Sequence, residues 1–237
     1  MSTSEIDKLK EKWTAKQIDM AKEVITVDQI EPIKIIAGLD ISFVKESDNA
    51  CVTIALLSYP DMKLVHQISK MVLMKYPYIP GFLGFREVDF FVELLKEVPN
   101  EFKPQILFID GNGILHYRKF GSASHIGVLS GIPTIGVSKN LLYVEQFSTE
   151  YIAEEMTKIP HAKGNYFKLV GTSGFVYGAC LLTSNSLKHP MYVSIGNKVS
   201  LETAVKLTLE TCQFRMPEPV RQADLISRDF IRKIKIN

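Results

Sequence analysis

The feature that most constrains the fold of this 237-residue chain is a succession of three strand-like segments separated by short polar connections. The segments cover residues 33–44, 50–58 and 64–74, and the connections between them are only a few residues long. Connections of hairpin length join strands that pair antiparallel. We therefore predict a meander of three antiparallel strands.

A different pattern follows, in which helices and strands alternate. Residues 86–98 carry apolar side chains at helical spacing, and residues 105–110, 122–130 and 133–138 read as a strand, a helix and a second strand. That order predicts a parallel pair of strands. The remaining elements are predicted as helices at 148–159, 200–212 and 219–233 and as strands at 167–183 and 191–196. This is the element order of the ribonuclease H-like fold, so we predict an α/β domain with a mixed central sheet flanked by helices.

The first part of the chain precedes this sheet and is predicted as an amphipathic helix. Ile6, Leu9 and Trp13 recur at helical spacing among charged residues over positions 4–26. Contact with a membrane or a partner is one interpretation, but Trp13 favours docking on the body of the protein. No linker or repeat divides the chain. We expect one domain over residues 1–237, with residues 1–30 as an N-terminal helix packed on it.

The overall composition argues against several classes of protein. The 28 Lys and Arg residues against 26 Asp and Glu leave a net charge of +2, so any polyanion site must be local. The 3 cysteines have no paired spacing, which argues against a disulfide framework and a zinc site. No secretory signal or membrane-spanning run is recognisable. We expect a monomer without membrane contact that is cytoplasmic, with the nucleus and nucleolus left open.

Three carboxylates stand in apolar surroundings, where a charge is costly to bury. Asp40 lies inside a strand-like run, Asp110 closes another, and Glu87 follows the glycine-containing segment 81–85. The expected topology places the first and fourth strands side by side beneath the helix that carries Glu87, so the three side chains converge. Convergent carboxylates favour Mg²⁺ or Mn²⁺ and metal-dependent phosphodiester hydrolysis. Each acid alone has a plainer interpretation, as a turn, helix-start or hydrogen-bonded residue.

Cationic and imidazole side chains accompany these acids. Lys139 follows the strand predicted to run parallel to the fourth strand, at the end where open α/β sheets bind ligands, so we expect it to contact a phosphate. His116 and His125 are as readily buried core residues as groups that act on the phosphate or on an attacking water. Arg118 and Lys119 supply local positive charge.

The connection before the helix is rigid and apolar, because Pro77 and Pro80 bracket Tyr78 and Ile79. Such a segment is suited to act as a wedge that unstacks a nucleic acid and exposes one base. A loop that fills the core is an equally good interpretation from the residues alone.

Taken together, these segments resemble the endonuclease V family, whose members cut nucleic acids at inosine. The matching segments lie between residues 38 and 228 and read GLDISFVK, PYIPGFLGFRE, FIDGNGILHYRKFGSASHIGVLSGIPTIGVSKNLL, YVSIGNKVSLETAV and FRMPEPVRQADLISR. By motifs of this length and specificity, the chain is identified as a member of the family.

The resemblance implies a role for individual residues. Asp40, Glu87 and Asp110 look like the catalytic, metal-binding carboxylates, and Lys139 looks like the contact to the scissile phosphate. Asp224 falls where many members carry a further acidic residue near the metal. The wedge and the hypoxanthine pocket, together with the two histidines, give the residues that we expect to bind substrate: Pro77, Tyr78, Ile79, Pro80, Gly81, Leu83, Gly111, His116, Gly121 and His125.

The resemblance also implies a reaction. The family hydrolyses the second phosphodiester bond on the 3′ side of inosine, leaving 3′-hydroxyl and 5′-phosphate ends, with Mg²⁺ as cofactor and Mn²⁺ as a substitute. Asn112 and the pattern GNG-x-LH-x-R-x-FG are typical of eukaryotic members, which prefer inosine-containing RNA. We therefore expect an endonuclease that acts on inosine in single-stranded RNA and more weakly in DNA. The alternatives are an inosine-DNA repair endonuclease, a non-catalytic inosine-RNA binding protein and a structure-specific nuclease of the same fold.

Overall fold

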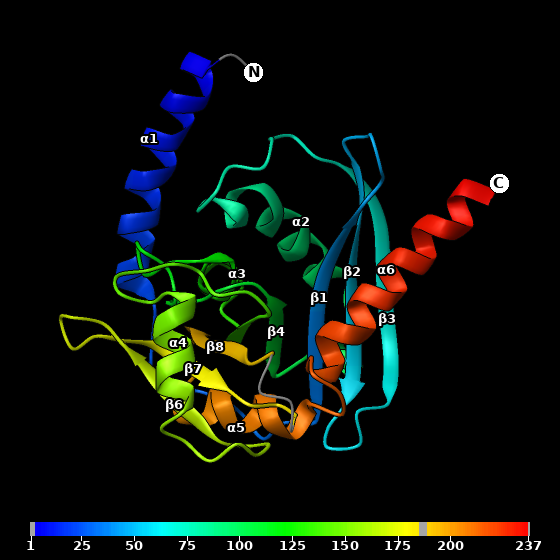
Figure 1. Cartoon of the computed structure of the whole chain (residues 1–237). Coiled ribbons are helices and arrows are strands. Elements are labelled where there is room, and N and C mark those ends of the chain that lie inside the picture. Colours follow the sequence, from blue (N-terminus) through cyan, green and yellow to red (C-terminus); the bar gives the residue numbers. More distant parts are fainter. Residues whose placement is uncertain (1–2, 185–188, 237) are drawn as a thin grey trace.

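An eight-stranded mixed sheet forms the centre of the computed structural model, which describes residues 3–184 and 189–236, and its strand order is β3-β2-β1-β4-β5-β8-β7-β6 (Figure 1). The strands are β1 (Ile35–Phe43), β2 (Asn49–Ser58), β3 (Leu64–Leu73), β4 (Ile106–Asp110), β5 (Thr134–Ser138), β6 (Tyr166–Val170), β7 (Val176–Leu181) and β8 (Met191–Asn197). The helices are α1 (Thr3–Met20), α2 (Leu83–Glu97), α3 (Ser122–Ser130), α4 (Thr149–Met156), α5 (Leu201–Thr211) and α6 (Glu218–Ile236), with short 3-10 turns η1 (Ala21–Glu23) and η2 (Asn100–Phe102).

The pairing of the first five strands agrees with the expected topology. Strands β1, β2 and β3 pair antiparallel, and β4 lies parallel to both β1 and β5. The predicted α/β class with a mixed sheet flanked by helices, in the ribonuclease H-like order, is therefore confirmed. One prediction was wrong: residues 167–183 form not one strand but the hairpin β6–β7. The chain reverses there, and Gly174 has a φ of +80°, which a side chain would resist.

Local sequence explains where several of these elements begin and end. The Ser148 and Ser200 hydroxyls each accept a hydrogen bond from a backbone N–H three residues later, which caps the first turns of α4 and α5. Helix α3 ends at Gly131, whose φ of +70° places it in the left-handed conformation that is common at helix ends.

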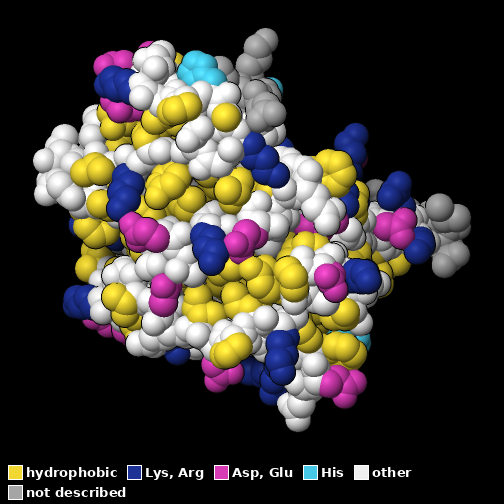
Figure 2. All heavy atoms as spheres, turned by 90° about the horizontal axis from the view of Figure 1, so that it is seen from below, with side chains coloured by type: hydrophobic (Ala, Val, Ile, Leu, Met, Phe, Trp, Pro, Cys, Tyr) yellow, Lys and Arg dark blue, Asp and Glu magenta, His cyan; other side chains and the backbone are white. Residues whose placement is uncertain are grey.

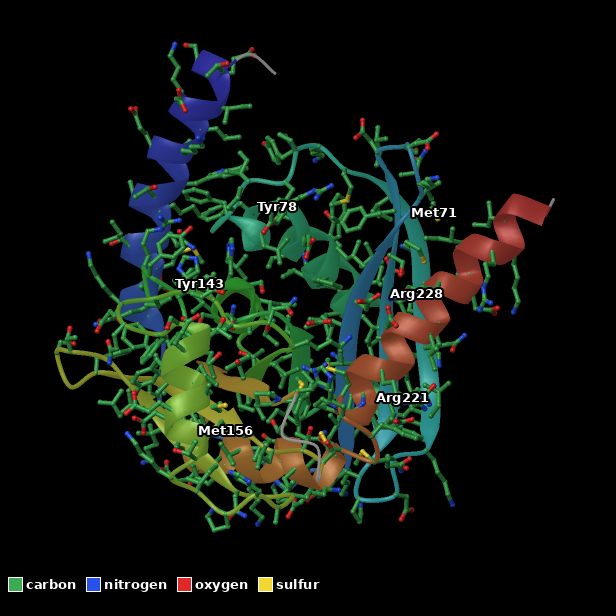
Figure 3. All side chains as sticks on the ribbon, in the orientation of Figure 1. Met71, Tyr78, Tyr143, Met156, Arg221 and Arg228 are labelled. Carbon is green, nitrogen blue, oxygen red and sulfur yellow. The ribbon has the colours of Figure 1, made fainter. Side chains whose placement is uncertain are left out.

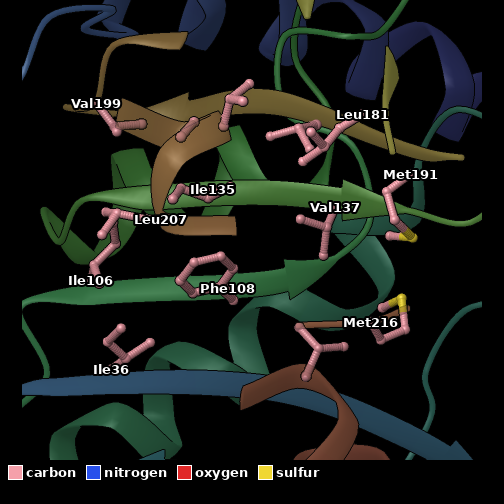
Figure 4. Packing of buried hydrophobic residues seen from close by; sticks show 14 of the residues in the cluster. Ile36, Ile106, Phe108, Ile135, Val137, Leu181, Met191, Val199, Leu207 and Met216 are labelled. Carbon is pink, nitrogen blue, oxygen red and sulfur yellow. The ribbon is translucent and has the colours of Figure 1, made fainter. Parts of the chain in front are cut away.

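Helices cover both faces of the sheet, and alternating strand residues feed two separate cores. On one face, Ile36 and Phe108 pack with Leu207 of α5 and Val220 of α6. Figure 4 shows this core, with residues from neighbouring strands facing the helices. On the other face, the intervening strand residues pack against α2 and α3. A third core joins α4 to β6 and β7.

Helix α1 runs along one side of the molecule, with its first turns projecting beyond the body (Figure 1). Its Trp13 is only 6% exposed and packs with Phe82 and Phe85, so this helix docks through the expected anchor. No helix among the described residues has the length and hydropathy to cross a membrane. Figure 2 shows Lys and Arg interspersed with Asp and Glu on the face seen from below, in keeping with the balanced charge.

Candidate active site

Two aspartates stand side by side at the carboxyl end of the parallel pair β1 and β4. The register pairs Leu39 with Ile109, so Asp40 and Asp110 follow at matching positions on the two strands. Leu39 and Ile109 belong to the core beneath α2 and α3. Because successive side chains of a strand point to opposite faces, both aspartates turn toward the face that α6 covers.

Helix α6 brings further polar groups against Asp40. Ser227 Oγ donates a hydrogen bond to Asp40 Oδ2 at 2.7 Å, and Asp224 lies one turn earlier in the helix. Asp224 Oδ1 is 2.7 Å from Arg228 Nε. Burial raises the pKa of Asp40 to about 6, and repulsion by Asp224 and Asp110 adds to this effect, whereas the Ser227 hydrogen bond opposes it.

Glu87 approaches the same region from α2, which packs on the other face of the sheet. Burial raises the pKa of Glu87 to about 8, Arg86 opposes this shift, and repulsion by Asp40 and Asp110 strengthens it. Burial also raises the pKa of Asp110, while the charge of Lys139 lowers it. Each of these carboxyl groups therefore binds its proton more tightly in the folded protein than it would as an exposed side chain in water.

These acids form a donor set that suits a small, hard cation such as Mg²⁺ or Mn²⁺. A divalent ion would relieve the repulsion that helps to raise the pKa values of Asp40 and Glu87. Within residues 3–184 and 189–236, however, no three His, Cys, Asp or Glu side chains are grouped closely enough to hold an ion as they stand. The metal site therefore stays a prediction.

A groove of about 760 Å³ lies between β1 and α6. The charged side chains that line it are Asp40, Asp110, Lys139, Asp224, Arg228 and Arg232. Figure 3 labels Arg228 on α6, on the side of the helix next to β1. The predicted phosphate contact Lys139 thus shares one groove with three of the predicted acids and with two arginines. Its three cations stand beside three aspartates, so a phosphate would meet positive charge at Lys139 and the arginines rather than over the whole groove.

A second cavity, of about 300 Å³, adjoins the groove, because Asp110 lines both. Its walls come from the loop before α2 and from the loop between β4 and α3. It collects most of the residues that we expected to bind substrate, namely Tyr78, Gly81, Leu83, Gly111, His116, Gly121 and His125. Segments that are far apart in the sequence therefore meet in one cavity beside the acids.

The glycines of this cavity permit close approaches that a side chain would block. Gly81 has a φ of +80°, and a Cβ there would lie 1.3 Å from Tyr117 Oη. A Cβ on Gly121 would lie 2.1 Å from the carbonyl oxygen of Asn112. The approach of the loop before α2 to Tyr117 therefore depends on Gly81, and the fold of the loop between β4 and α3 depends on Gly121.

His116 is a buried hydrogen-bond donor in the cavity wall. The backbone N–H of Arg118 donates to His116 Nδ1 at 3.1 Å, so the neutral ring carries its hydrogen on Nε2. Burial and the Arg118 charge lower the pKa of His116 to about 4, with the backbone of Gly81 acting in the opposite direction. Within the described part of the chain, Nε2 is buried and makes no hydrogen bond. The neutral ring therefore has a buried N–H in the cavity wall, close to the Gly81 backbone.

His125 lies both in the core and at the cavity, so it has features of the two roles that the sequence left open, a buried core residue and a residue of the site. It lines the cavity, yet it packs between the rings of Phe85 and Phe120, whose centroids lie 4.7 and 5.4 Å away. Burial, together with the charge of Lys16, lowers the pKa of His125 to about 4. It is a neutral core histidine at the edge of the cavity.

The predicted wedge divides into exposed and buried residues. Tyr78 is 61% exposed and lines the cavity, and Figure 3 labels it in the loop between β3 and α2. Pro77 and Pro80 are also exposed. Ile79, which we expected to contact the substrate, is only 6% exposed and packs in the cluster that contains Trp13. Its side chain fixes the loop to Trp13 and Phe82.

Sequence reasoning missed three polar residues of the cavity. Asn112 Oδ1 and Ser122 Oγ are buried and have no hydrogen-bond partner among the described residues. Gln17 reaches the cavity from α1. The available signals were weak: Asn112 lies in a turn, Ser122 begins a helix, and Gln17 follows Trp13 by four residues, on the same face of an amphipathic helix.

A family model described as Endonuclease V matches residues 18–225 of the chain. The chain belongs to the endonuclease V family. Endonuclease V of Mus musculus is 43% identical over 233 residues, which cover 93% of this chain and 69% of the mouse protein. Endonuclease V of Homo sapiens is 41% identical over 233 residues, which cover 93% of this chain and 83% of the human protein. The family prediction is confirmed, and the protein is a nuclease.

Solved structures of the family agree with this assignment. The crystal structure of human endonuclease V superimposes with a TM-score of 0.88 at 39% identity, covering 95% of this chain and 99% of the human one. Endonuclease V of Ciona intestinalis gives a TM-score of 0.90 at 32% identity, covering 96% of this chain and 99% of that one. The Ciona protein is in complex with a 24mer DNA that contains an inosine followed by a ribo-adenosine.

Proposed function

We propose that this protein is a Mg²⁺-dependent endoribonuclease that cleaves the second phosphodiester bond on the 3′ side of inosine in single-stranded RNA, and more weakly in DNA. The observation that carries the proposal is the shared position of Asp110, which lines both the base-sized cavity and the groove of acids. A strand with its inosine in the cavity passes its following phosphates over Asp110 and Lys139. The cut then falls beyond the recognised base rather than at it.

The cavity suits hypoxanthine better than adenine. His116 offers a neutral N–H from Nε2, which can donate to the C6 carbonyl oxygen of hypoxanthine but meets an amino group in adenine. A buried donor left without a partner costs about 1–3 kcal/mol. The unpartnered oxygens of Asn112 and Ser122 offer further polar contacts in the same wall.

The acids and Lys139 divide the chemistry between them. Asp40, Glu87 and Asp110 would hold the metal, with Asp224 beside them, and Mn²⁺ would replace Mg²⁺. When bound, the ion would supply a water of lowered pKa and neutralise charge on the phosphate. The Lys139 ammonium stabilises the same charge from within the groove. Hydrolysis breaks the bond between phosphorus and the 3′ oxygen, which leaves a 3′-hydroxyl and a 5′-phosphate.

The preference for RNA is supported by the ligand of the Ciona protein. Its strand carries a ribonucleotide immediately after the inosine. The 3′ phosphodiester of that nucleotide is the second bond beyond inosine, so its 2′-hydroxyl stands next to the bond that we propose is cut. A contact to this hydroxyl is how a protein distinguishes RNA from DNA.

The test is cleavage of matched end-labelled RNA and DNA strands that carry inosine, adenosine or guanosine at one position, in Mg²⁺ and again with chelator. We expect chelator-sensitive cutting of the inosine RNA, one nucleotide beyond the inosine, and slower cutting of the inosine DNA. Faster cutting of DNA would favour a repair endonuclease. Equal cutting of strands without inosine would favour a structure-specific nuclease.

Isosteric variants test the assigned acids. Asp40→Asn and Asp110→Asn should each abolish cutting and keep binding of the inosine strand, because the fold and the cavity stay in place. Asp61→Asn is the matched control, since this aspartate is exposed in the connection between β2 and β3. Selective inosine binding without cutting by the unaltered protein would favour the binding-protein alternative.

A further inference from the structure

Gln17 of α1 connects the two walls of the base cavity. Its side chain is only 3% exposed. Nε2 donates to the carbonyl oxygen of Gly81 at 3.2 Å and also to the carbonyl oxygen of Phe120. Gly81 belongs to the loop before α2, and Phe120 belongs to the loop between β4 and α3. One amide group therefore bonds both loops that enclose the cavity.

Arg118 completes this network. Its Nε donates to Gln17 Oε1, and its Nη2 donates to the carbonyl oxygen of Gly81 at 3.0 Å. The guanidinium also lies 4.3 Å from the ring centroid of Phe82 and 4.4 Å from that of Tyr117. The amide nitrogen and the amide oxygen of Gln17 therefore both have hydrogen-bond partners. The carbonyl oxygen of Gly81, a residue that lines the cavity, accepts hydrogen bonds from Gln17 and Arg118.

Apolar contacts fix the helix that carries Gln17. Trp13, four residues earlier, lies with its ring centroid 5.0 Å from that of Phe85 and 5.1 Å from that of Tyr76. These aromatic contacts dock α1 on the body of the protein together with the other apolar residues of the same cluster. A buried amide beside them is costly unless it is hydrogen-bonded, so its place in this interface is explained by the carbonyls that it bonds. Gln17 also precedes residues 18–225, which the family model matches.

We propose that Gln17 is a positioning residue for base selection, which holds the two cavity walls at the spacing that accepts hypoxanthine and excludes larger purines. This inference rests on the proposed inosine specificity. Guanine shares the C6 oxygen of hypoxanthine and differs by one exocyclic 2-amino group. A rigid wall helps to reject so small a difference, and Gln17 bonds the Gly81 and Phe120 walls to each other. It does so in addition to the direct hydrogen bonds from Arg118 to Gly81 and from Tyr117 to Pro80.

The test compares Gln17→Leu with the unaltered protein. Leucine keeps most of the volume and suits the apolar docking surface, but it bonds neither carbonyl. We expect the ratio of kcat/KM for inosine RNA to kcat/KM for guanosine RNA to fall about tenfold or more. Ile18→Ala is the matched control, because this neighbour on α1 is 51% exposed and should keep the original ratio.

Hydrogen exchange gives a readout that needs no activity. In Gln17→Leu, amides of residues 76–85 and 111–121 should exchange faster, whereas those of β4 should not. An unchanged selectivity ratio in folded Gln17→Leu would overturn the proposal, and so would an equal loss of cutting on every strand. If the unaltered protein shows no inosine cutting, the proposed function fails. In that case hydrogen exchange still tests whether Gln17 holds the two loops together. Unchanged exchange of residues 76–85 and 111–121 in Gln17→Leu would show that it does not.

Discussion

The Ser227 hydroxyl donates a 2.7 Å hydrogen bond to Asp40 and lies 2.7 Å from the Ser42 hydroxyl. The carbonyl oxygen of Asp224 lies 3.0 Å from the same Ser227 hydroxyl. Because a hydroxyl carries one hydrogen, Ser42 donates to Ser227 when Ser227 donates to Asp40, and the two serines then form a chain that ends on the carboxylate. Ser227 is fully buried. Helix α6 therefore supports the carboxylate of β1 as well as covering its face of the sheet.

This chain predicts the effect of Ser227→Ala. Loss of the hydrogen bond should raise the pKa of Asp40 further and weaken its affinity for Mg²⁺, because the bond stabilises the ionised form. The Mg²⁺ concentration for half-maximal cleavage should rise about 3- to 10-fold. Ser42→Ala should have a smaller effect, since this hydroxyl lies 3.4 Å from Asp40. Identical Mg²⁺ curves for Ser227→Ala and the unaltered protein would contradict the assignment.

The raised pKa values predict how pH and metal affect stability together. Folding raises the pKa of Asp40 from 3.8 to about 6 and that of Glu87 from 4.5 to about 8. At pH values between the unfolded and the folded pKa of each group, the folded protein therefore binds more protons at these two carboxyl groups than the unfolded chain does. The stability that these two groups contribute to the metal-free protein is therefore fully present below about pH 4 and is lost as pH rises through 6 and 8. The buried His116 and His125, whose pKa values are lowered to about 4, act in the opposite direction in acid.

Mg²⁺ competes with these protons, so its stabilising effect should grow as pH rises. Thermal unfolding with Mg²⁺ and with chelator should show a larger difference in Tm near pH 8.5 than near pH 6. Glu87→Gln should remove the part of the pH dependence near 8. A Tm difference that does not change with pH would show that protons and the ion do not share these carboxylates.

The sequence predicted those features of the site that follow from strand alternation and chain order. Asp40 follows the apolar run 35–39 inside its strand and Asp110 ends another strand, and the parallel pairing of these two strands, which chain order predicts, brings the two aspartates together. The hairpin between β6 and β7 was missed because apolar residues continue on both sides of its turn. Residue type and local spacing therefore predict which strands pair, but they do not show where a continuous apolar segment turns.

Contacts between distant segments could not be predicted in this way. Ile79 is apolar and bracketed by prolines, which suits an exposed wedge and a buried anchor equally well, and only the position of Trp13 decides between them. Gln17 reads as one more polar residue of an amphipathic helix. Its bonds to Gly81 and Phe120 join residues 64 and 103 positions away. Such contacts depend on tertiary packing.

The close approach of α6 to β1 gives a further prediction. A Cβ at Gly38 would lie 2.0 Å from the carbonyl oxygen of Pro219, so Gly38→Ala must push the start of α6 outward. We expect a loss of about 1–3 kcal/mol in the free energy of unfolding, together with slower cleavage, because Asp224 and Ser227 move away from Asp40. Urea unfolding and cleavage at saturating Mg²⁺ measure the two effects.

Gly174→Ala is the control for the Gly38 variant. A Cβ there meets nothing within 4 Å, although the φ of +80° resists a side chain. It should cost about 1 kcal/mol of stability and leave cleavage unchanged. If both variants reduce cleavage equally, the contact between Gly38 and α6 has no special role at the site.

The division of the wedge predicts opposite results for two neighbouring residues. Tyr78→Ala removes a side chain that is 61% exposed, so the free energy of unfolding should change by about 0.5 kcal/mol or less. Binding of inosine strands should weaken, because Tyr78 lines the cavity. Ile79→Ala removes a side chain that is 6% exposed and should cost about 2–5 kcal/mol of stability. Urea unfolding and strand binding of both variants test this, and equal destabilisation by the two would show that Tyr78 is a core residue.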